Sequence, residues 1–352
     1  MGGSAAIIGG GIGGLAAARA LRGAGWQVRV FEKAPDVDAA GTALGMWPAA
    51  VAALDEIGIG AAVRRTGAPQ EGGSFLRPDG SRIASVAATR RGAADPVYLL
   101  SRPALLRLLV DGLPAGALRL DTDVDDVRAL QADHDLVVVA DGVFSRTRSA
   151  LFGDTTRATY AGATAWRGTV AGATTTVTET WGPGQRFGIT PREDGRTNWY
   201  ASAVLPERSA APAGELAELR DRFGGWHPGV RRILDVLREP DILRHDLYDL
   251  RPPLRTYISG NAVLIGDAAH AMTPDLGRGA CEALIDAVTL ARCVAGAPRI
   301  ADGLATYDRM RRPPTQRLAR VSRLVGHMAH ARRFRAARDL AARAAVAVGP
   351  PA

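Results

Sequence analysis

The feature that most constrains the fold of this chain is a run of glycines near the N-terminus, in residues 9–14. An apolar segment of residues 5–8 precedes the run, and residues 15–23 have the composition of a helix. Residues 28–31 then form a second strand-like segment that ends at Glu32. This order of strand, G-x-G-x-x-G turn, helix, strand and acid is typical of a dinucleotide-binding βαβ unit, so an α/β fold is expected.

Each glycine of the run has a physical task in such a unit. Gly9 makes the tight turn, Gly11 lets the backbone approach a pyrophosphate, and Gly14 allows the helix to pack closely against the strand. Glu32 can accept hydrogen bonds from the 2′-hydroxyl of an adenosine ribose, and its charge disfavours a 2′-phosphate. The pocket is therefore predicted to take FAD or NAD rather than NADP.

A second strand-to-helix connection lies far along the chain, in residues 262–287. Its apolar start predicts a buried strand that ends at Asp267, and residues 277–280 open a helix. A helix start carries unpaired N–H groups and a partial positive charge, which suits a ligand that becomes anionic, such as the N1–C2=O edge of a reduced flavin. Asp267 can accept hydrogen bonds from a polyol chain. Taken alone, the segment could equally be an ordinary connection.

Two further segments place charged residues where ligands of such folds bind. Residues 136–140 form an apolar strand that ends at Asp141, and the carboxyl ends of parallel strands are the ligand-binding edge of a doubly wound sheet. Ser101 and Pro103 predict the start of a helix. Arg102 could therefore meet a phosphate or a flavin edge, or could remain a solvated arginine.

From residue 159 the chain becomes rich in threonine and aromatic residues, in short segments separated by glycine and proline turns. This pattern predicts an antiparallel sheet, and hence a second domain inserted into the first. Residues 118–127 suggest a pair of strands, and the final helices are expected to separate at Pro313 and Pro314. The predicted division is a nucleotide-binding domain in residues 1–65, 95–158 and 251–300, a substrate-domain excursion in 66–94, a β-sheet substrate domain in 159–250, and C-terminal helices in 301–352.

The net charge of +8 comes almost wholly from arginine, because Lys33 is the only lysine. Arginines cluster in residues 309–343 among apolar residues at helical spacing, without the stacking aromatics of a nucleic-acid module, so a packed helix is favoured over nucleic-acid binding. No apolar run is long enough to span a membrane. Cys281 and Cys293 are too far apart along one predicted helix to form a disulfide. A soluble, cytoplasmic protein is expected.

Three separated motifs together resemble those of the class A flavoprotein monooxygenases with the p-hydroxybenzoate hydroxylase fold. They are the segment from Gly9 to Glu32, the Ala-Asp-Gly of residues 140–142, and the Gly-Asp-Ala-Ala-His of residues 266–270 with Pro274 beyond it. The resemblance covers nearly the whole chain and points to the short urate hydroxylase-like and salicylate hydroxylase-like branch. It implies an α/β fold with a Rossmann-like FAD-binding domain, an inserted antiparallel β-sheet substrate domain and C-terminal helices.

The resemblance also implies a reaction. NADH or NADPH would be a transient reductant of FAD, and O₂ would add to give a flavin C4a-hydroperoxide that hydroxylates or epoxidises a small aromatic or conjugated molecule of specialised metabolism. No second glycine-rich motif is visible for the nicotinamide, which fits transient docking. A monomer or a homodimer is expected, with no nucleic-acid partner.

The resemblance assigns residues to the FAD site position by position. The ADP half would lie on the glycine run and Glu32, the pyrophosphate beside Asp141, the ribityl chain on Asp267, and the isoalloxazine along residues 274–281. The residues implied as cofactor-binding are Gly9, Gly11, Gly14, Glu32, Lys33, Gly45, Arg102, Val124, Asp141, Asp267, Gly277, Arg278, Gly279 and Ala280.

The substrate-pocket candidates are Arg186, Asn198, Trp199 and Pro274. Arg186 could bind an anionic or carbonyl group, because its planar guanidinium matches a carboxylate or imide edge. Trp199 could instead belong to the core, since successive strand residues alternate between faces. The sequence identifies no catalytic acid or base and no metal site.

Three residues depart from the family pattern: Ala49 and Asp275 stand where asparagine is common, and Arg278 where glutamine is common. We hypothesise that Arg278 stabilises the anionic reduced flavin. The alternatives to a monooxygenase are another flavoenzyme of this fold, such as a halogenase or an FAD-linked reductase, and a non-catalytic binding protein that keeps the FAD fold.

Overall fold

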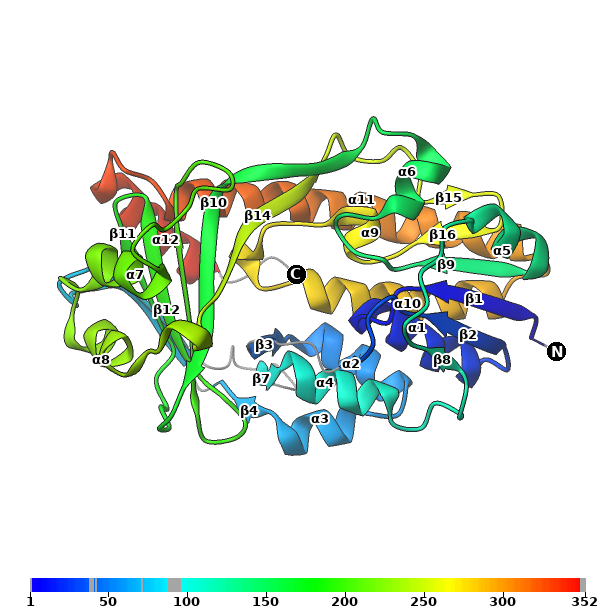
Figure 1. Cartoon of the computed structure of the whole chain (residues 1–352), viewed down its shortest axis with the longest axis horizontal. Helices are drawn as coiled ribbons and strands as arrows, with labels where there is room; N and C mark the ends of the chain where they lie inside the picture. Colours follow the sequence, from blue (N-terminus) through cyan, green and yellow to red (C-terminus); the bar gives the residue numbers. More distant parts are fainter. Residues whose placement is uncertain (1, 38–40, 42, 71, 88–95, 349–352) are drawn as a thin grey trace.

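The computed structural model describes residues 2–37, 41, 43–70, 72–87 and 96–348. Within these residues the chain forms three sheets, of six, seven and three strands. Figure 1 shows the six-stranded sheet at one end of an elongated molecule and the seven-stranded sheet at the other. Helix α11 (Ile300–Ala329) extends along the molecule from the first sheet towards the second (Figure 1). The α/β fold class expected from the sequence is confirmed.

The six-stranded sheet contains the predicted βαβ unit and the two later strands that end at acidic residues. Its order is β15-β16-β9-β1-β2-β8, parallel from β16 to β8, with β15 antiparallel at the edge. Helices α1 (Ile12–Gly23) and α10 (Gly279–Ala295) pack against each other. The strands are β1 (Ser4–Ile8), β2 (Gln27–Phe31), β8 (Leu118–Arg119), β9 (Leu136–Val139), β15 (Ile258–Ser259) and β16 (Ala262–Leu264). Strands β9 and β16 are buried throughout, as parallel strands covered on both faces should be.

A three-stranded sheet in the order β3-β7-β4 lies with helices α2 to α4 between the larger sheets (Figure 1). Ser101 caps α4, because its Oγ accepts a hydrogen bond from the N–H of Ala104 at 3.2 Å. This capping fixes the helix start that the sequence predicts. The elements are β3 (Ala43–Met46), α2 (Pro48–Glu56), α3 (Gly60–Thr66), β4 (Ala68–Pro69), β7 (Tyr98–Ser101) and α4 (Arg102–Val110).

The seven-stranded sheet has the order β14-β10-β13-β12-β11-β5-β6, and all neighbours are antiparallel except β11 and β5. Helices α7 (Glu215–Phe223) and α8 (Pro228–Val236) cover one face, with Trp166, Phe187 and Trp199 in the shared core. The strands are β5 (Gly72–Leu76), β6 (Arg82–Ala87), β10 (Arg157–Val170), β11 (Thr178–Gly182), β12 (Gln185–Pro191), β13 (Thr197–Ala203) and β14 (Leu243–Arg251). The sequence pattern gives no signal for β14, because charged residues and a histidine interrupt its apolar positions.

The prediction of a strand pair in residues 118–127 is wrong. The chain forms only the short β8 there, and Asp126 caps helix α5 (Val127–Asp133) by accepting hydrogen bonds from the N–H groups of Arg128 and Ala129. An N-cap of this kind favours a helix over an extended strand. The remaining short elements are α6 (Arg146–Phe152), α9 (Asp267–His270) and the 3₁₀ turns η1 (Glu239–Asp241) and η2 (Pro274–Leu276).

The prediction of a helix break at Pro313 and Pro314 is also wrong, because α11 continues through both prolines. Tertiary packing outweighs the local cost of a proline here. The buried residues Tyr307 and Thr315 lie on either side of the prolines, and the Thr315 hydroxyl donates to the carbonyl of Arg311 at 2.7 Å.

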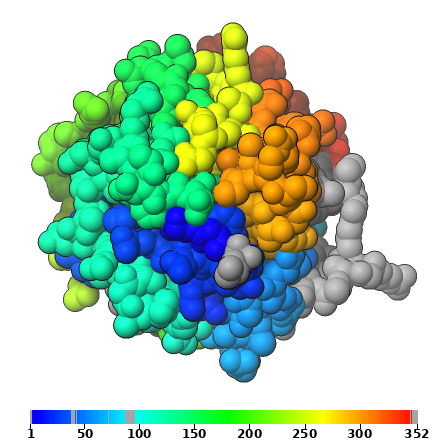
Figure 2. All heavy atoms as spheres, turned by 90° about the vertical axis from the view of Figure 1, so that its right-hand side faces the viewer, coloured from blue at the N-terminus to red at the C-terminus, as the bar shows by residue number. Residues whose placement is uncertain are grey.

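Helix α12 (Arg335–Val348) completes the described chain and packs against β6. Figure 2 shows the end of the molecule that contains the six-stranded sheet. N-terminal residues border residues near position 300 there, although these segments are far apart in the sequence. In the parts of the chain that the structure describes, no helix combines the length and the hydrophobicity needed to cross a membrane.

Candidate active site

The glycine turn after β1 is closely packed at both ends and open in the middle. Gly9 has a φ of +105°, and a Cβ there would lie 2.4 Å from the carbonyl oxygen of Ala140. A Cβ on Gly14 would lie 1.9 Å from the Gly9 carbonyl oxygen. A Cβ on Gly11, by contrast, would meet no atom within 4 Å. The packing requires glycine at both ends, while the position of Gly11 leaves room for a ligand at the start of α1.

Glu32 lies beside this turn at the end of β2. Its Oε2 accepts a hydrogen bond from the N–H of Gly10 at 2.5 Å, which orients the carboxylate. The N–H of Thr122 donates to the Glu32 carbonyl at 2.9 Å, so the segment that contains the half-buried Val124 lies next to Glu32 and the exposed Lys33. A carboxylate oxygen has a second lone pair, and Glu32 can therefore still accept from a ribose hydroxyl.

Two acidic residues follow the neighbouring strands β9 and β16 at one edge of the sheet. Asp141 accepts a hydrogen bond from the N–H of Thr147 at 3.3 Å through Oδ2, while its buried Oδ1 has no partner among the described residues. Asp267 keeps some exposed surface, but the surrounding protein displaces water from its carboxylate, and this desolvation raises its pKa. The positive charges of His270 and Arg102 oppose this rise. Both carboxylates therefore keep acceptor capacity in a recessed position, where ligand hydroxyls could use it.

The start of α10 lies beside Asp267. A Cβ on Gly279 would sit 3.9 Å from Asp267 Oδ1. Gly277, in the left-handed conformation with a φ of +62°, turns the chain from η2 into α10, and the thiol of Cys281 reaches the carbonyl oxygen of Gly45 at 3.1 Å. Strand β3 thus packs on the first turn of α10. The predicted residues 277–280 and Gly45 are brought together with Asp267, while Pro274 is exposed at the start of η2.

A buried ionic cluster fixes the turn that precedes Asp267. Asp286, with no exposed surface, accepts hydrogen bonds from the N–H of Gly266 at 2.9 Å, from His270 Nε2 at 2.5 Å and from Arg311 Nε at 2.6 Å. Burial alone would raise the pKa of Asp286, but the charges of His270 and Arg311 lower it to about 2. His270 is therefore engaged in a structural pair with Asp286.

Arg278 lies at the first turn of α10 and is already engaged within the protein. Its guanidinium pairs with Glu282 at 2.9 Å and lies 5.6 Å from the ring centroid of Trp47. Glu282 also pairs with Arg311 at 2.6 Å. The positive charge of Arg278 at the helix start is therefore partly balanced, which limits its effect on a nearby anion.

The alternation of β13 separates the two adjacent substrate-pocket candidates. Asn198 Oδ1 accepts a hydrogen bond from the N–H of Ala43 in β3 at 3.1 Å, so the face that carries Asn198 is turned towards the FAD-domain side. Trp199 points to the opposite face, has no exposed surface, and stacks on Phe187 with ring centroids 5.7 Å apart. The prediction that Trp199 lines the substrate pocket is therefore wrong.

Arg186 shares the face of Asn198, but its guanidinium already forms two ion pairs within the protein. Its guanidinium pairs with Asp275 at 2.8 Å and with Glu179 at 3.3 Å, and these charges raise its pKa despite burial. The Tyr200 hydroxyl donates to Glu179 at 2.5 Å. A guanidinium that already has two carboxylates is not free to bind a substrate anion, so this part of the expectation for Arg186 does not hold. The Asp275 pair instead joins β12 to η2.

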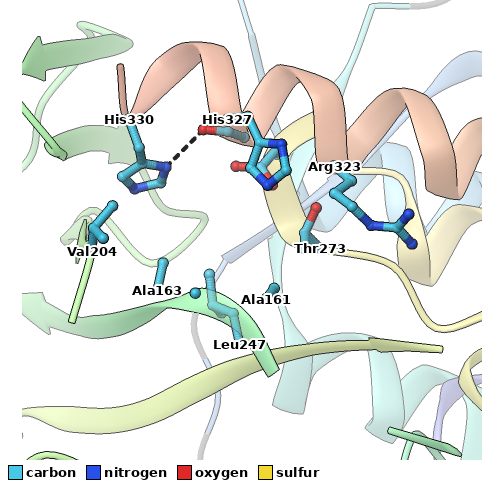
Figure 3. Close-up of a pocket in the computed structure, with 11 residues that line it drawn as sticks. Ala161, Ala163, Val204, Leu247, Thr273, Arg323, His327 and His330 are labelled. Carbon is cyan, nitrogen blue, oxygen red and sulfur yellow. Dashed lines mark hydrogen bonds between the residues drawn. The ribbon is translucent and has the colours of Figure 1, made fainter. Parts of the chain in front are cut away.

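A pocket of about 240 Å³ lies between α11 and the strands β10 and β14, next to η2. Figure 3 shows Arg323 and His327 on α11 and His330 just beyond its end, opposite the small or aliphatic side chains of Ala161, Ala163, Val204 and Leu247. Thr273 and Asp275 line it from the loop before and within η2. The sequence did not indicate this pocket, because its walls come from five distant segments.

The face of the seven-stranded sheet that carries Asn198 and is turned towards the FAD-domain side is called the inward face. Its remaining feature is a group of basic residues that the sequence did not single out together. Arg167 on β10 pairs in register with Tyr200 on β13, and therefore shares its face of the sheet. Arg102, the first residue of α4, lies within electrostatic range of both Arg167 and Asp267. His245 on β14 has a pKa lowered to about 4 by burial and by Arg167.

These features fit FAD. The open position at Gly11, the oriented Glu32, the unpaired Oδ1 of Asp141 and the carboxylate of Asp267 lie along one edge of the sheet, in the order that an ADP group, a pyrophosphate and a polyol chain require. The first turn of α10 comes next, and its N–H groups suit the edge of a ring that gains negative charge.

Comparison with known proteins agrees with this geometry. The FAD binding domain family matches residues 4–322. The aurachin C monooxygenase/isomerase of Stigmatella aurantiaca is 36% identical over 325 residues, which cover 87% of this chain and 84% of that protein. The 3-amino-4-hydroxybenzoate 2-monooxygenase of Streptomyces cremeus is 35% identical over 92% of this chain and 87% of that protein.

The solved structure of Klebsiella pneumoniae HpxO with FAD and uric acid superposes with a TM-score of 0.88 at 25% sequence identity, and covers 97% of this chain and 93% of that chain. The family match gives FAD as the cofactor, and both relatives are named as monooxygenases. The chain therefore belongs to the FAD-binding, class A flavoprotein monooxygenase family, and is an FAD-dependent enzyme of the aromatic hydroxylase type.

Proposed function

We propose that this enzyme hydroxylates or epoxidises a small aromatic or conjugated molecule between the start of α10 and the inward face of the seven-stranded sheet. The observation that carries the proposal is that distant segments meet at one sheet edge: the open turn at Gly11, the unpaired Oδ1 of Asp141 and the exposed Asp267. This edge leads to the sheet face that carries Asn198 and Tyr200. A cofactor held along the edge would present its ring to that face.

The residues of the chain would bind and orient the cofactor and would exclude water from the reacting atoms. Gly11 and Glu32 would hold the pyrophosphate and the adenosine ribose, and Asp267 would accept hydrogen bonds from the polyol chain. When bound, FAD supplies the redox chemistry that takes hydride from NADH or NADPH and activates O₂ for transfer. The first N–H groups of α10 would stabilise negative charge at the ring edge. The sheet would keep water from the reacting atoms.

The substrate class follows from the relatives and from the residues present. One relative is named for 3-amino-4-hydroxybenzoate, and the solved HpxO structure contains uric acid. A ring of this kind is already electron-rich, and its hydroxylation does not require a protein base. We therefore infer an electron-rich conjugated ring as substrate.

We also propose a transient docking site for NADH or NADPH, a cytoplasmic location and a monomeric or homodimeric state. The sequence contains one dinucleotide fingerprint, in residues 9–14, which leaves no second fold to hold a nicotinamide permanently. The two cysteines are free thiols, which is usual in a reducing compartment.

The proposal is tested with the purified, FAD-loaded protein. NADH and NADPH oxidation are followed with a panel of hydroxybenzoates, hydroxypyridines and quinolones, and products are analysed by mass spectrometry with isotopically labelled O₂. We expect at least one compound to accelerate oxidation and to gain one labelled oxygen atom. Acceleration without labelled product would indicate uncoupled peroxide formation, and no acceleration across the panel would contradict the proposed substrate class.

A matched pair of variants links the activity to the site. Asp267→Asn removes the charge of the carboxylate beside the start of α10, so weaker FAD binding and lower product formation are expected. Asp302→Asn changes an exposed acid of α11 and should leave both unchanged. If the purified wild-type protein is colourless and does not bind added FAD, a non-catalytic binding role would be favoured.

A further inference from the structure

Arg167 lies on β10 at the face of the sheet that is turned inward. In register, it pairs with Tyr200 on β13 and with Leu243 on β14. Its neighbour Trp166 points the other way, into the aromatic core under α7 and α8, with no exposed surface. Since strand residues alternate between faces, the Arg167 side chain is held on the inward side.

The guanidinium of Arg167 has no anionic partner among the described residues. Its Nε is buried without a hydrogen-bond partner, and no ion pair joins Arg167 to a described acid. Arg186, on the same face, has two carboxylates. Burying a cation without a partner is costly, so a site that holds one is suited to an anion supplied from outside the protein.

The described groups around Arg167 add no negative charge to balance it, unlike those around Arg186. Arg102 is the charged group whose repulsion, after burial itself, lowers the pKa of Arg167. His245 on the adjacent strand is half-buried and uncharged at neutral pH, because desolvation and Arg167 lower its pKa to about 4. Arg102 also interacts with Asp267, which belongs to the cofactor side. Arg102 is therefore within electrostatic range of both Arg167 on the sheet and Asp267 on the cofactor side.

We propose that Arg167 binds an oxygen anion carried by the conjugated substrate, such as a carboxylate or a deprotonated ring oxygen, with His245 as a neighbouring hydrogen-bond partner. The planar fork of a guanidinium matches both oxygens of a carboxylate. Arg102 then remains with Asp267 on the cofactor side. This inference rests on the proposed function, because it assigns the substrate class of the same chamber.

The test is equilibrium binding to the oxidised, FAD-loaded protein, which requires no turnover. Salicylate and its neutral counterpart salicylamide are titrated separately, and the flavin absorption spectrum reports binding. We expect wild type to prefer salicylate, and Arg167→Gln to weaken salicylate binding at least tenfold with little change for salicylamide. Arg167→Lys should restore part of the preference, because it keeps the charge without the fork.

The matched control is Arg196→Gln, which removes the same charge from an exposed turn of the same sheet and should change neither titration. The dissociation constant of FAD and the free energy of unfolding are measured for each variant. In Arg167→Gln the dissociation constant of FAD should be unchanged, and the free energy of unfolding should be equal or higher, since the side chain makes no described bond within the protein and its unpaired charge is removed.

Four results would overturn the assignment. Wild type could fail to bind salicylate, or could bind both compounds equally. Arg167→Gln could weaken FAD binding tenfold while the salicylate preference persists, which would assign the cation to an anionic group of the cofactor. It could also lower the free energy of unfolding, which would indicate a structural role. If Arg167-dependent binding is found but no compound is hydroxylated, this site stands and the proposed function fails.

Discussion

Replacing Asp286 with asparagine tests how the turn before Asp267 is held. Asp286 is fully buried and accepts hydrogen bonds from Gly266, His270 and Arg311 at 2.5–2.9 Å. Its pKa falls from 3.8 to about 2 in the folded protein, which corresponds to about 2 kcal/mol of stability at neutral pH. Removing the carboxylate also leaves Arg311 without one of its two acids, and breaking a buried pair costs about 3–5 kcal/mol.

The expected loss for Asp286→Asn is therefore about 3–5 kcal/mol in the free energy of unfolding, measured by urea titration with saturating FAD. A folded pKa below the unfolded value means that the contribution of the charge is fully present above pH 3.8 and is lost as the pH falls towards 2. The difference between wild type and variant should therefore shrink across that window.

The control for this experiment is Asp302→Asn. Asp302 pairs with Arg299 at 2.9 Å, but both side chains are largely exposed, at 45% and 79%. An exposed pair contributes at most about 1 kcal/mol. If Asp286→Asn costs no more than Asp302→Asn, the argument that the buried cluster fixes this turn is wrong.

Three further outcomes are expected. Gly11→Ala should fold but bind FAD more weakly, since its Cβ meets no protein atom and would enter the ligand space. Gly23→Ala, at the exposed end of α1, should bind FAD normally, and equal dissociation constants for the two variants would argue against a ligand site at Gly11. Arg278→Gln should lower the flavin midpoint potential, modestly because Glu282 already balances the charge, and an unchanged potential would reject a role for Arg278. Trp199→Phe should cost about 1–3 kcal/mol in urea titration and leave the substrate KM unchanged; a raised KM would place Trp199 in the pocket after all.

The parts of the fold that the sequence predicted well are those set by local chemistry. The glycine run, Glu32 and the strand ends at Asp141 and Asp267 follow from short-range rules about turns and carboxyl ends. The cap at Ser101 is equally local, because the side chain bonds the backbone three residues away.

The parts that the sequence missed depend on contacts between distant segments. Trp199 and Asn198 are neighbours in sequence, and only the docking of α7 and α8 decides which faces the core. The prolines of α11 are accommodated by packing that no local rule contains. Arg167 could not be recognised as unpaired, because that property concerns every acid the folded chain could bring near it.

Helix α11 touches both halves of the molecule, and its length therefore cannot be changed freely. Ser322 donates to the Thr273 carbonyl at 2.6 Å beside η2, and His330, just after the helix, bonds Ser202 of the seven-stranded sheet at 2.8 Å. One residue inserted before Ser322 would rotate everything downstream by about 100° about the helix axis. Both contacts would then be lost together. Insertions should be tolerated in the connection after His330, and not within the thirty residues of α11.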